Sequence, residues 1–212
     1  ADALSELRED LRDLRHEVVA VGAREPVHAG AIPPLGGVLL HPRDYHVEAV
    51  AFETDRVRWQ VLDPRLKEDF SAFESLDGDV SIVSRNDADT VWYLLVNRPE
   101  RSPAFWRWDR RARKAQFLFA ARPKLDDYDL APMTPVSFAA RDGLRLHAYL
   151  TTPVGRPATK LPMVVLVHGG PWVRDRWGFH PEAQWLASLG LACLQVNYRG
   201  STGFGKRFLH AG

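Results

Sequence analysis

The chain has 212 residues, of which 45% are hydrophobic, so it can bury one large core or two smaller ones. Its 28 Lys and Arg residues balance 27 Asp and Glu residues, and this balance gives no summed field that favours nucleic acid or an anionic membrane surface. The single cysteine, Cys193, excludes an internal disulfide, and we expect it to be a small core residue of a cytoplasmic protein.

The N-terminal residues, ADALSELREDLRDLRH, are heavily charged and lack the apolar stretch of a signal peptide. Their leucines at three-to-four spacing favour an amphipathic helix, with a blade strand as the alternative. From about residue 37 to 120, alternation of apolar and polar residues predicts short strands. These segments are GGVLLHP, HVEAVAFE, VRWQVLD, DVSIVSRN, TVWYLLVN, AFWRWD and AQFLFA, and TDR and DRRARK are expected hairpin turns.

These strands divide into two units of roughly forty residues, each with a tryptophan near a strand end. Such weak self-similarity favours two blades of a propeller, with a β-sandwich as the alternative. A pure binding module is a further reading, but nothing in the strands names a partner. Trp92, Trp106 and Trp108 are explained more simply as packing residues.

The strand pattern lapses at RPKLDDYDLAPMTP, where three prolines make a regular element improbable: Pro123, Pro132 and Pro135. We therefore predict a domain boundary here, with one domain at residues 1–130 and the next at 131–212. Beyond the boundary, VSFAARDGLRLHAYLTTP predicts a hairpin that turns at Asp142 and Gly143.

The segment LPMVVLVHGGPW is an apolar run that ends at a histidine and two glycines. No alternation occurs from Met163 to Val167, so we expect both faces of this strand to be covered. A helix is predicted from His180-Pro181-Glu182 to Gly190, and LACLQV forms a second strand. The residues expected to form the buried stripe of that helix are Trp185, Leu186 and Leu189.

Strand, helix and strand make a βαβ unit, which brings HGGP and NYRG to the same edge of a parallel sheet. Glycines in HGGP let backbone N–H groups approach a ligand, as in the oxyanion hole of α/β-hydrolases, although a tight turn without a ligand is the alternative. A second reading concerns GSTGFGK, where Gly200, Gly205 and Lys206 have the spacing of a phosphate-binding loop. Arg207 stands where such a loop has Ser or Thr to ligate magnesium.

The stretch HGGPWVRDRWGFHPEAQWLASLGLACLQVNYRGSTGFGKRFLHAG resembles the start of the hydrolase domain of the prolyl-oligopeptidase family, in its acylaminoacyl-peptidase and dipeptidyl-aminopeptidase-like branch. AVAFETDRVRWQVLDP and FLFAARPKLDDYDLAPMTPVSFAARDGL resemble that branch's last blades and linker, so the likeness covers about residues 35–212. It implies an antiparallel β-propeller fragment followed by the N-terminal part of an α/β-hydrolase domain. It also implies a serine peptidase whose propeller admits peptides and excludes folded proteins.

The same resemblance implies that the amide of Gly169 helps to hold an oxyanion and that Gly170 and Pro171 fix the loop. His168 is expected to shape this loop, and Arg199 to hold neighbouring loops together rather than to touch substrate.

No G-x-S-x-G motif occurs in the sequence, so the Ser, Asp and His of a triad are expected after Gly212. The chain alone is therefore predicted to be inactive. Its expected partners are a peptide substrate and the rest of the same hydrolase, with the oligomeric state left open. We expect no nucleic acid, membrane, cofactor or metal, and an esterase is the alternative activity because one oxyanion hole serves esters and amides alike.

Overall fold

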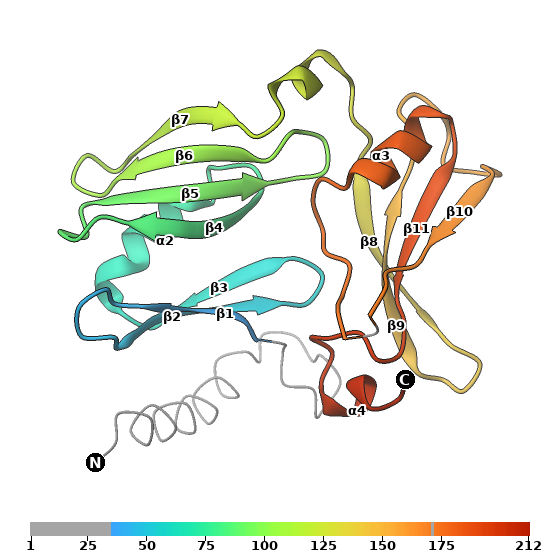
Figure 1. Cartoon of the computed structure of the whole chain (residues 1–212), viewed down its shortest axis with the longest axis horizontal. Helices are drawn as coiled ribbons and strands as arrows, with labels where there is room; N and C mark the ends of the chain where they lie inside the picture. Colours follow the sequence, from blue (N-terminus) through green and yellow to red (C-terminus); the bar gives the residue numbers. More distant parts are fainter. Residues whose placement is uncertain (1–34, 171) are drawn as a thin grey trace. The chain divides into compact units, whose positions relative to one another are not determined.

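The computed structural model describes residues 35–170 and 172–212 (Figure 1). The first sheet is antiparallel, in the order β1-β2-β3: β1 is Leu35–Leu40, β2 is Val47–Glu53 and β3 is Val57–Val61. The segment TDR joins β2 to β3 as a hairpin turn, as predicted. The expected helix or strand at the start of the chain lies outside the described residues.

A helical segment that the sequence patterns did not predict follows β3. It consists of the 3-10 turn η1 (Pro64–Leu66) and the helix α2 (Lys67–Phe73). Asp63 caps η1, because its side chain accepts a hydrogen bond from the Arg65 N–H at 2.9 Å. The phenylalanines of α2 are buried, and this packing stabilises a helix too short to persist by propensity alone.

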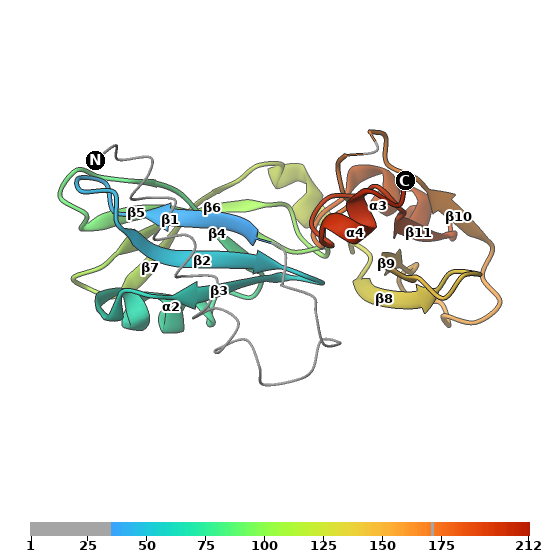
Figure 2. The ribbon, with the colours of Figure 1, turned by 90° about the horizontal axis from the view of Figure 1, so that it is seen from below.

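The second sheet has four antiparallel strands in chain order (Figures 1 and 2). They are β4 (Asp79–Arg85), β5 (Val91–Asn97), β6 (Ala104–Asp109) and β7 (Lys114–Ala120). The segment DRRARK forms the turn between β6 and β7. All seven strands predicted between about residues 37 and 120 are therefore confirmed.

Aromatic side chains from these two sheets and α2 form the main buried cluster. Trp92 of β5 is fully buried, and its ring lies 6.0 Å from that of Phe73, which in turn meets Trp108 edge-on at 5.3 Å. The indole N–H of Trp108 donates to the Asp69 carboxylate at 2.8 Å, so this polar edge is satisfied inside the core. The tryptophans are thus packing residues, as predicted.

The third sheet has the order β10-β11-β9-β8. After the 3-10 turn η2 (Pro123–Asp127), its strands are β8 (Met133–Ala139), β9 (Arg145–Thr151), β10 (Met163–Leu166) and β11 (Ala192–Asn197). The helices α3 (Pro181–Ser188) and α4 (Lys206–Leu209) complete the described elements. β10 and β11 are parallel, which confirms the predicted βαβ unit, and the β8–β9 hairpin turns at Asp142 and Gly143 as expected.

The proline-rich segment is more regular than its sequence indicates. Pro123 begins η2, and Pro135 lies inside β8 opposite Tyr149. β8 is an edge strand, where a residue without an N–H is tolerated. The change from the second sheet to the third falls between β7 and β8, but the boundary at residue 130 stays a prediction.

The expectation that both faces of β10 are covered is wrong for the described residues. Met163 and Val165 are each 52% exposed and Val167 is 58% exposed, because β10 lies at the sheet edge and pairs only with β11 among the described strands. Cys193 of β11, one strand further in, is completely buried, as predicted.

The predicted stripe of α3 is also wrong. His180 caps the helix and Gly190 follows its end with a positive φ of 83°, so its limits are confirmed. However, the helix packs toward β9 and β11 through its small and polar residues, which are Ala183, Gln184 and Ala187. Trp185 and Leu189 are 63% and 57% exposed.

In the part of the chain that the structure describes, no helix is long and apolar enough to cross a membrane.

Candidate functional site: the glycine loop after β10

The loop that follows β10 is held from the side by the loop that follows β11. His168 Nε2 lies 2.8 Å from the Ser201 hydroxyl, and the Tyr198 hydroxyl donates to the His168 carbonyl at 2.8 Å. The imidazole also stacks on the Tyr198 ring, with centroids 4.5 Å apart. Parallel pairing of β10 and β11 brings the two loops to one sheet edge, and these contacts fix the start of the glycine segment.

Gly169 and Gly170 differ in what they require. A Cβ at Gly169 would meet nothing within 4 Å among the described atoms, so this backbone faces open space. Gly170 has a φ of 128°, and a Cβ there would lie 2.6 Å from the Val173 side chain. Only glycine therefore fits position 170. At position 169 the backbone conformation does not require glycine, so the missing side chain there leaves room above the loop. Among the described residues, neither amide has a hydrogen-bond acceptor.

A buried arm carries the chain from this loop toward α3. The Arg174 guanidinium donates to the backbone carbonyls of Glu53 and Thr54, at 2.8 Å each. The next residue, Asp175, donates its N–H to the Asn197 side chain at 2.8 Å. Its carboxylate accepts from Gln195 at 3.2 Å, and burial raises the pKa of Asp175 above its ordinary value. The arm thus connects the β2–β3 turn with β11.

The pairing of His168 with Ser201 does not make a catalytic pair. Ser201 is completely buried, so its hydroxyl cannot reach a substrate. Moreover, His168 Nδ1 lies 2.8 Å from the Gly169 carbonyl, where a triad would place a carboxylate. Ser188, the other hydroxyl near the site sequence, donates to the Trp185 carbonyl on α3. The contacts of His168 are those of a residue that positions the loop.

Arg199 contacts Asp142 in the β8–β9 turn, with Nη2 and Oδ1 2.6 Å apart. The guanidinium lowers the pKa of Asp142 to about 2. This ion pair joins two loops, while its role in the function stays a prediction. Pro171, the remaining residue that we assigned to the loop, lies outside the described residues.

The first three residues of GSTGFGK have no amide free for a phosphate in this conformation. The amides of Gly200, Ser201 and Thr202 all donate to backbone carbonyls, at 3.0, 3.0 and 2.9 Å. The following helix, α4, has only four residues. A phosphate-binding loop needs free amides and a longer helix, so the nucleotide reading loses its structural support.

The chain is similar in sequence and in fold to known proteins. The model of the prolyl oligopeptidase family matches residues 177–212. Dipeptidyl aminopeptidase BIII of Pseudoxanthomonas mexicana is 42% identical over 202 residues, which are 92% of this chain and 29% of that protein. The acylamino-acid-releasing enzyme of Sus scrofa is 46% identical over 67 residues, which are 30% of this chain and 9% of that enzyme.

Among solved structures, a puromycin-hydrolyzing peptidase of Mycobacterium tuberculosis is similar in fold. It has a TM-score of 0.56 and 24% identity, and the match covers 84% of this chain and 27% of that one. This likeness confirms the predicted fold class of antiparallel blade-type sheets followed by an α/β segment. The chain spans under a third of the length of the relatives it matches. Residues 177–212 carry prolyl oligopeptidase family sequence, and the predicted resemblance of the chain to that family of serine peptidases is confirmed.

Proposed function

We propose that this chain is part of a serine peptidase that hydrolyses short peptides through an acyl-enzyme, to which it contributes the oxyanion loop and part of the substrate gate. One observation carries the proposal: the open backbone at Gly169, at the carboxyl end of β10, with no acceptor for its amide among the described residues. Ligands of open α/β sheets bind at this end of the strands.

The loop has the rigidity that an oxyanion hole needs. Ser201 and Tyr198 hold His168 from one side, and Gly170 has a positive φ of 128°, a conformation that favours glycine. A preorganised N–H stabilises developing charge because it need not reorient as the carbonyl becomes tetrahedral. The absence of a side chain at position 169 lets the substrate carbonyl approach.

Similarity to a dipeptidyl aminopeptidase and to a puromycin-hydrolyzing peptidase supports small peptides as the substrate class. The gate is supported by the buried arm, since Arg174 connects the glycine loop to a blade turn. An entrance formed by the blades would then be mechanically linked to the oxyanion loop.

The direct test is a crystal structure of the full-length protein with a peptide boronate, whose oxygen stands in for the oxyanion. We expect that oxygen about 2.7–3.1 Å from the Gly169 nitrogen. A second donor supplied by a side chain elsewhere, with the Gly169 amide turned away, would refute the assignment.

A kinetic test complements the crystal structure. Gly169→Ala keeps the N–H but adds a methyl group where the substrate carbonyl would approach it. Because this methyl group should displace the carbonyl from the amide, we expect kcat to fall by about 100-fold, the size of the loss of one donor. Gly37→Ala in β1 is the matched control, since its Cβ would touch only Ala51 at 4.0 Å. Equal kinetics for both variants would contradict the proposal, and turnover of esters without peptides would favour the esterase.

The 212 residues alone should hydrolyse neither peptides nor activated esters, because oriented amides without a nucleophile form no acyl-enzyme. Labelling with a serine-directed phosphonate, followed by peptide mapping, checks this expectation. Covalent labelling of Ser201 or Ser188 would show that the nucleophile lies within this chain.

A further inference from the structure

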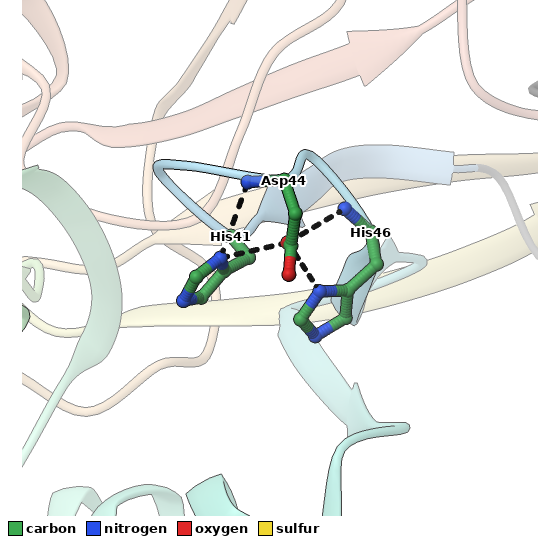
Figure 3. A group of neighbouring side chains, drawn as sticks. All are labelled: His41, Asp44 and His46. Atoms are coloured by element: carbon green, nitrogen blue, oxygen red, sulfur yellow. Dashed lines mark hydrogen bonds and ion pairs between the residues drawn. The ribbon is translucent and has the colours of Figure 1, made fainter. Parts of the chain in front are cut away.

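The loop between β1 and β2 carries three potential metal ligands within six residues, and the proposed peptidase function uses none of them. They are His41, Asp44 and His46 (Figure 3). Backbone hydrogen bonds close the loop, from the His41 N–H to the His46 carbonyl at 2.9 Å and from the Tyr45 N–H to the His41 carbonyl at 3.1 Å. Backbone hydrogen bonds therefore hold the loop conformation independently of the contacts among these three side chains.

Both imidazoles point their Nδ1 atoms at the same carboxylate oxygen (Figure 3). Asp44 Oδ1 lies 2.7 Å from His41 Nδ1 and 2.6 Å from His46 Nδ1. The two rings are stacked, with centroids 5.0 Å apart and planes 22° apart. Two nitrogen lone pairs and an anionic oxygen repel one another at such distances, so either an Nδ1 proton or a metal ion must lie in each contact.

His46 is also oriented from behind, as metal-binding histidines are. Its Nε2 lies 3.4 Å from Oδ2 of Asp63, whose side chain is only 7% exposed. Asp63 is itself held by the Arg65 guanidinium, with Nε 2.9 Å from Oδ2. The same Nε2 lies 3.4 Å from Arg65 Nη2, which is itself bound to Asp63. A proton on Nε2 directed at Asp63 would leave the lone pair on Nδ1, toward Asp44. A carboxylate behind a histidine in this way favours the tautomer that binds a metal.

We propose that His41, Asp44 and His46 form a binding site for a divalent transition-metal ion of the zinc class. Two imidazoles and one carboxylate suit zinc better than magnesium or calcium, which prefer oxygen ligands alone. Solvent supplies the fourth ligand, because Asp44 and His46 are 63% and 40% exposed. This proposal replaces the expectation, stated from the sequence, that the chain binds no metal.

The ligands can reach zinc geometry by side-chain rotation alone. Bonds of about 2.0–2.1 Å in a tetrahedral site place ligand atoms roughly 3.3 Å apart, so the present 2.6–2.7 Å contacts must widen. Asp44 and His46 are exposed and can move this far, while the half-buried His41 stays in place. Arg65 does not oppose the cation strongly, because Asp63 neutralises its charge.

The test is calorimetric titration of the untagged, metal-free full chain with Zn²⁺, and with Mg²⁺ as the selectivity control. We expect one Zn²⁺ per chain, and about 10- to 100-fold weaker binding in His41→Gln and in His46→Gln. His210→Gln, which removes an exposed histidine outside the loop, should bind as the unaltered chain does. Circular dichroism of each variant confirms that the fold is retained.

Cobalt supplies a second readout, because Co²⁺ in a tetrahedral site absorbs in the visible range and reports the ligand set directly. Asp44→Asn should shift or abolish that absorption. Absence of saturable Zn²⁺ binding, or binding that both loop histidine variants retain unchanged, would overturn the proposal. Its failure would leave the peptidase assignment untouched, since the boronate and kinetic tests involve other residues.

Discussion

The blade sheets and the α/β sheet differ in how far they bury their own apolar side chains. In the blades, Trp92 and Leu94 are completely buried by neighbours within residues 49–108. In the α/β sheet, β10 is well paired with β11 but leaves Met163 and Val165 half exposed. Backbone pairing is therefore enough to define a strand, whereas burial of its side chains needs packing elements that the described residues do not supply on that side.

The largest expected effect concerns the closed core of the blades. Trp92→Ala removes a fully buried ring and should lower the free energy of unfolding by about 3–5 kcal/mol, as measured by urea denaturation of the 212-residue chain. Trp185→Ala in α3, beside the α/β sheet, should change the free energy of unfolding by less than about 0.5 kcal/mol, because that ring is 63% exposed. Similar losses in both variants would abolish the distinction between the two regions.

A second prediction concerns buried charge in the blades. Arg85 donates to Glu48 at 2.7 Å, and their side chains are 7% and 1% exposed. Arg85→Met leaves the Glu48 carboxylate buried without its partner and should cost about 3 kcal/mol in the same unfolding assay. Arg113→Met breaks the exposed ion pair with Glu68 and should cost less than about 1 kcal/mol. Equal costs would show that the blade interior is more hydrated than the structure indicates.

Thiol labelling compares adjacent strands inside the α/β sheet. Burial raises the pKa of Cys193 to about 11, so at about pH 8 the thiol is both protonated and inaccessible. A cysteine placed at the exposed Val165, in a Cys193→Ala background, should react on the order of 100-fold faster. Equal rates in the folded chain would mean that β11 opens as readily as the edge strand.

The smallest expected effect lies at the surface, where Arg199 meets Asp142. Arg199→Gln should return the pKa of Asp142 from about 2 toward its ordinary value of 3.8, as followed by NMR titration. Because the folded-state pKa is lowered, the pair stabilises the fold above the ordinary pKa and loses its effect as the pH falls through about 2. Arg145→Gln, on the neighbouring strand β9, is the control, and an unchanged Asp142 pKa in Arg199→Gln would exclude the loop contact.

Periodicity predicted the strands well because the β pattern depends on a residue's own neighbours in the chain. It missed α2 because a seven-residue helix held by tertiary contacts has no long apolar repeat. It also misplaced the buried face of α3, where Ala183 and Ala187 allow close approach to the sheet while Trp185 faces outward. Hydrophobicity alone does not show which apolar side chains another element of the fold will bury.

The sequence predicted the glycine loop and its position beside NYRG, but not the side-chain contacts that hold it. His168, Tyr198 and Ser201 belong to two separate motifs, and only parallel pairing of β10 with β11 brings them together. The cluster at the β1–β2 loop carries a signal that could have been read, since His41, Asp44 and His46 follow an H-x-x-D-x-H spacing. Their convergence on one oxygen depends on the loop conformation, which spacing does not reveal.

Arg174 contacts Thr54 in the β2–β3 turn through its carbonyl oxygen rather than through its side chain. It also donates to the carbonyl of Glu53, whose carboxylate lies 3.9 Å from Arg174 Nε. Every amino acid supplies a carbonyl, so substitutions at Thr54 can accumulate over evolution without weakening this attachment. The constraint falls instead on the arginine, since a lysine has no planar fork to bond two successive carbonyls at once. Mutational tolerance should therefore be strongly one-sided, with Thr54 free to vary and Arg174 fixed.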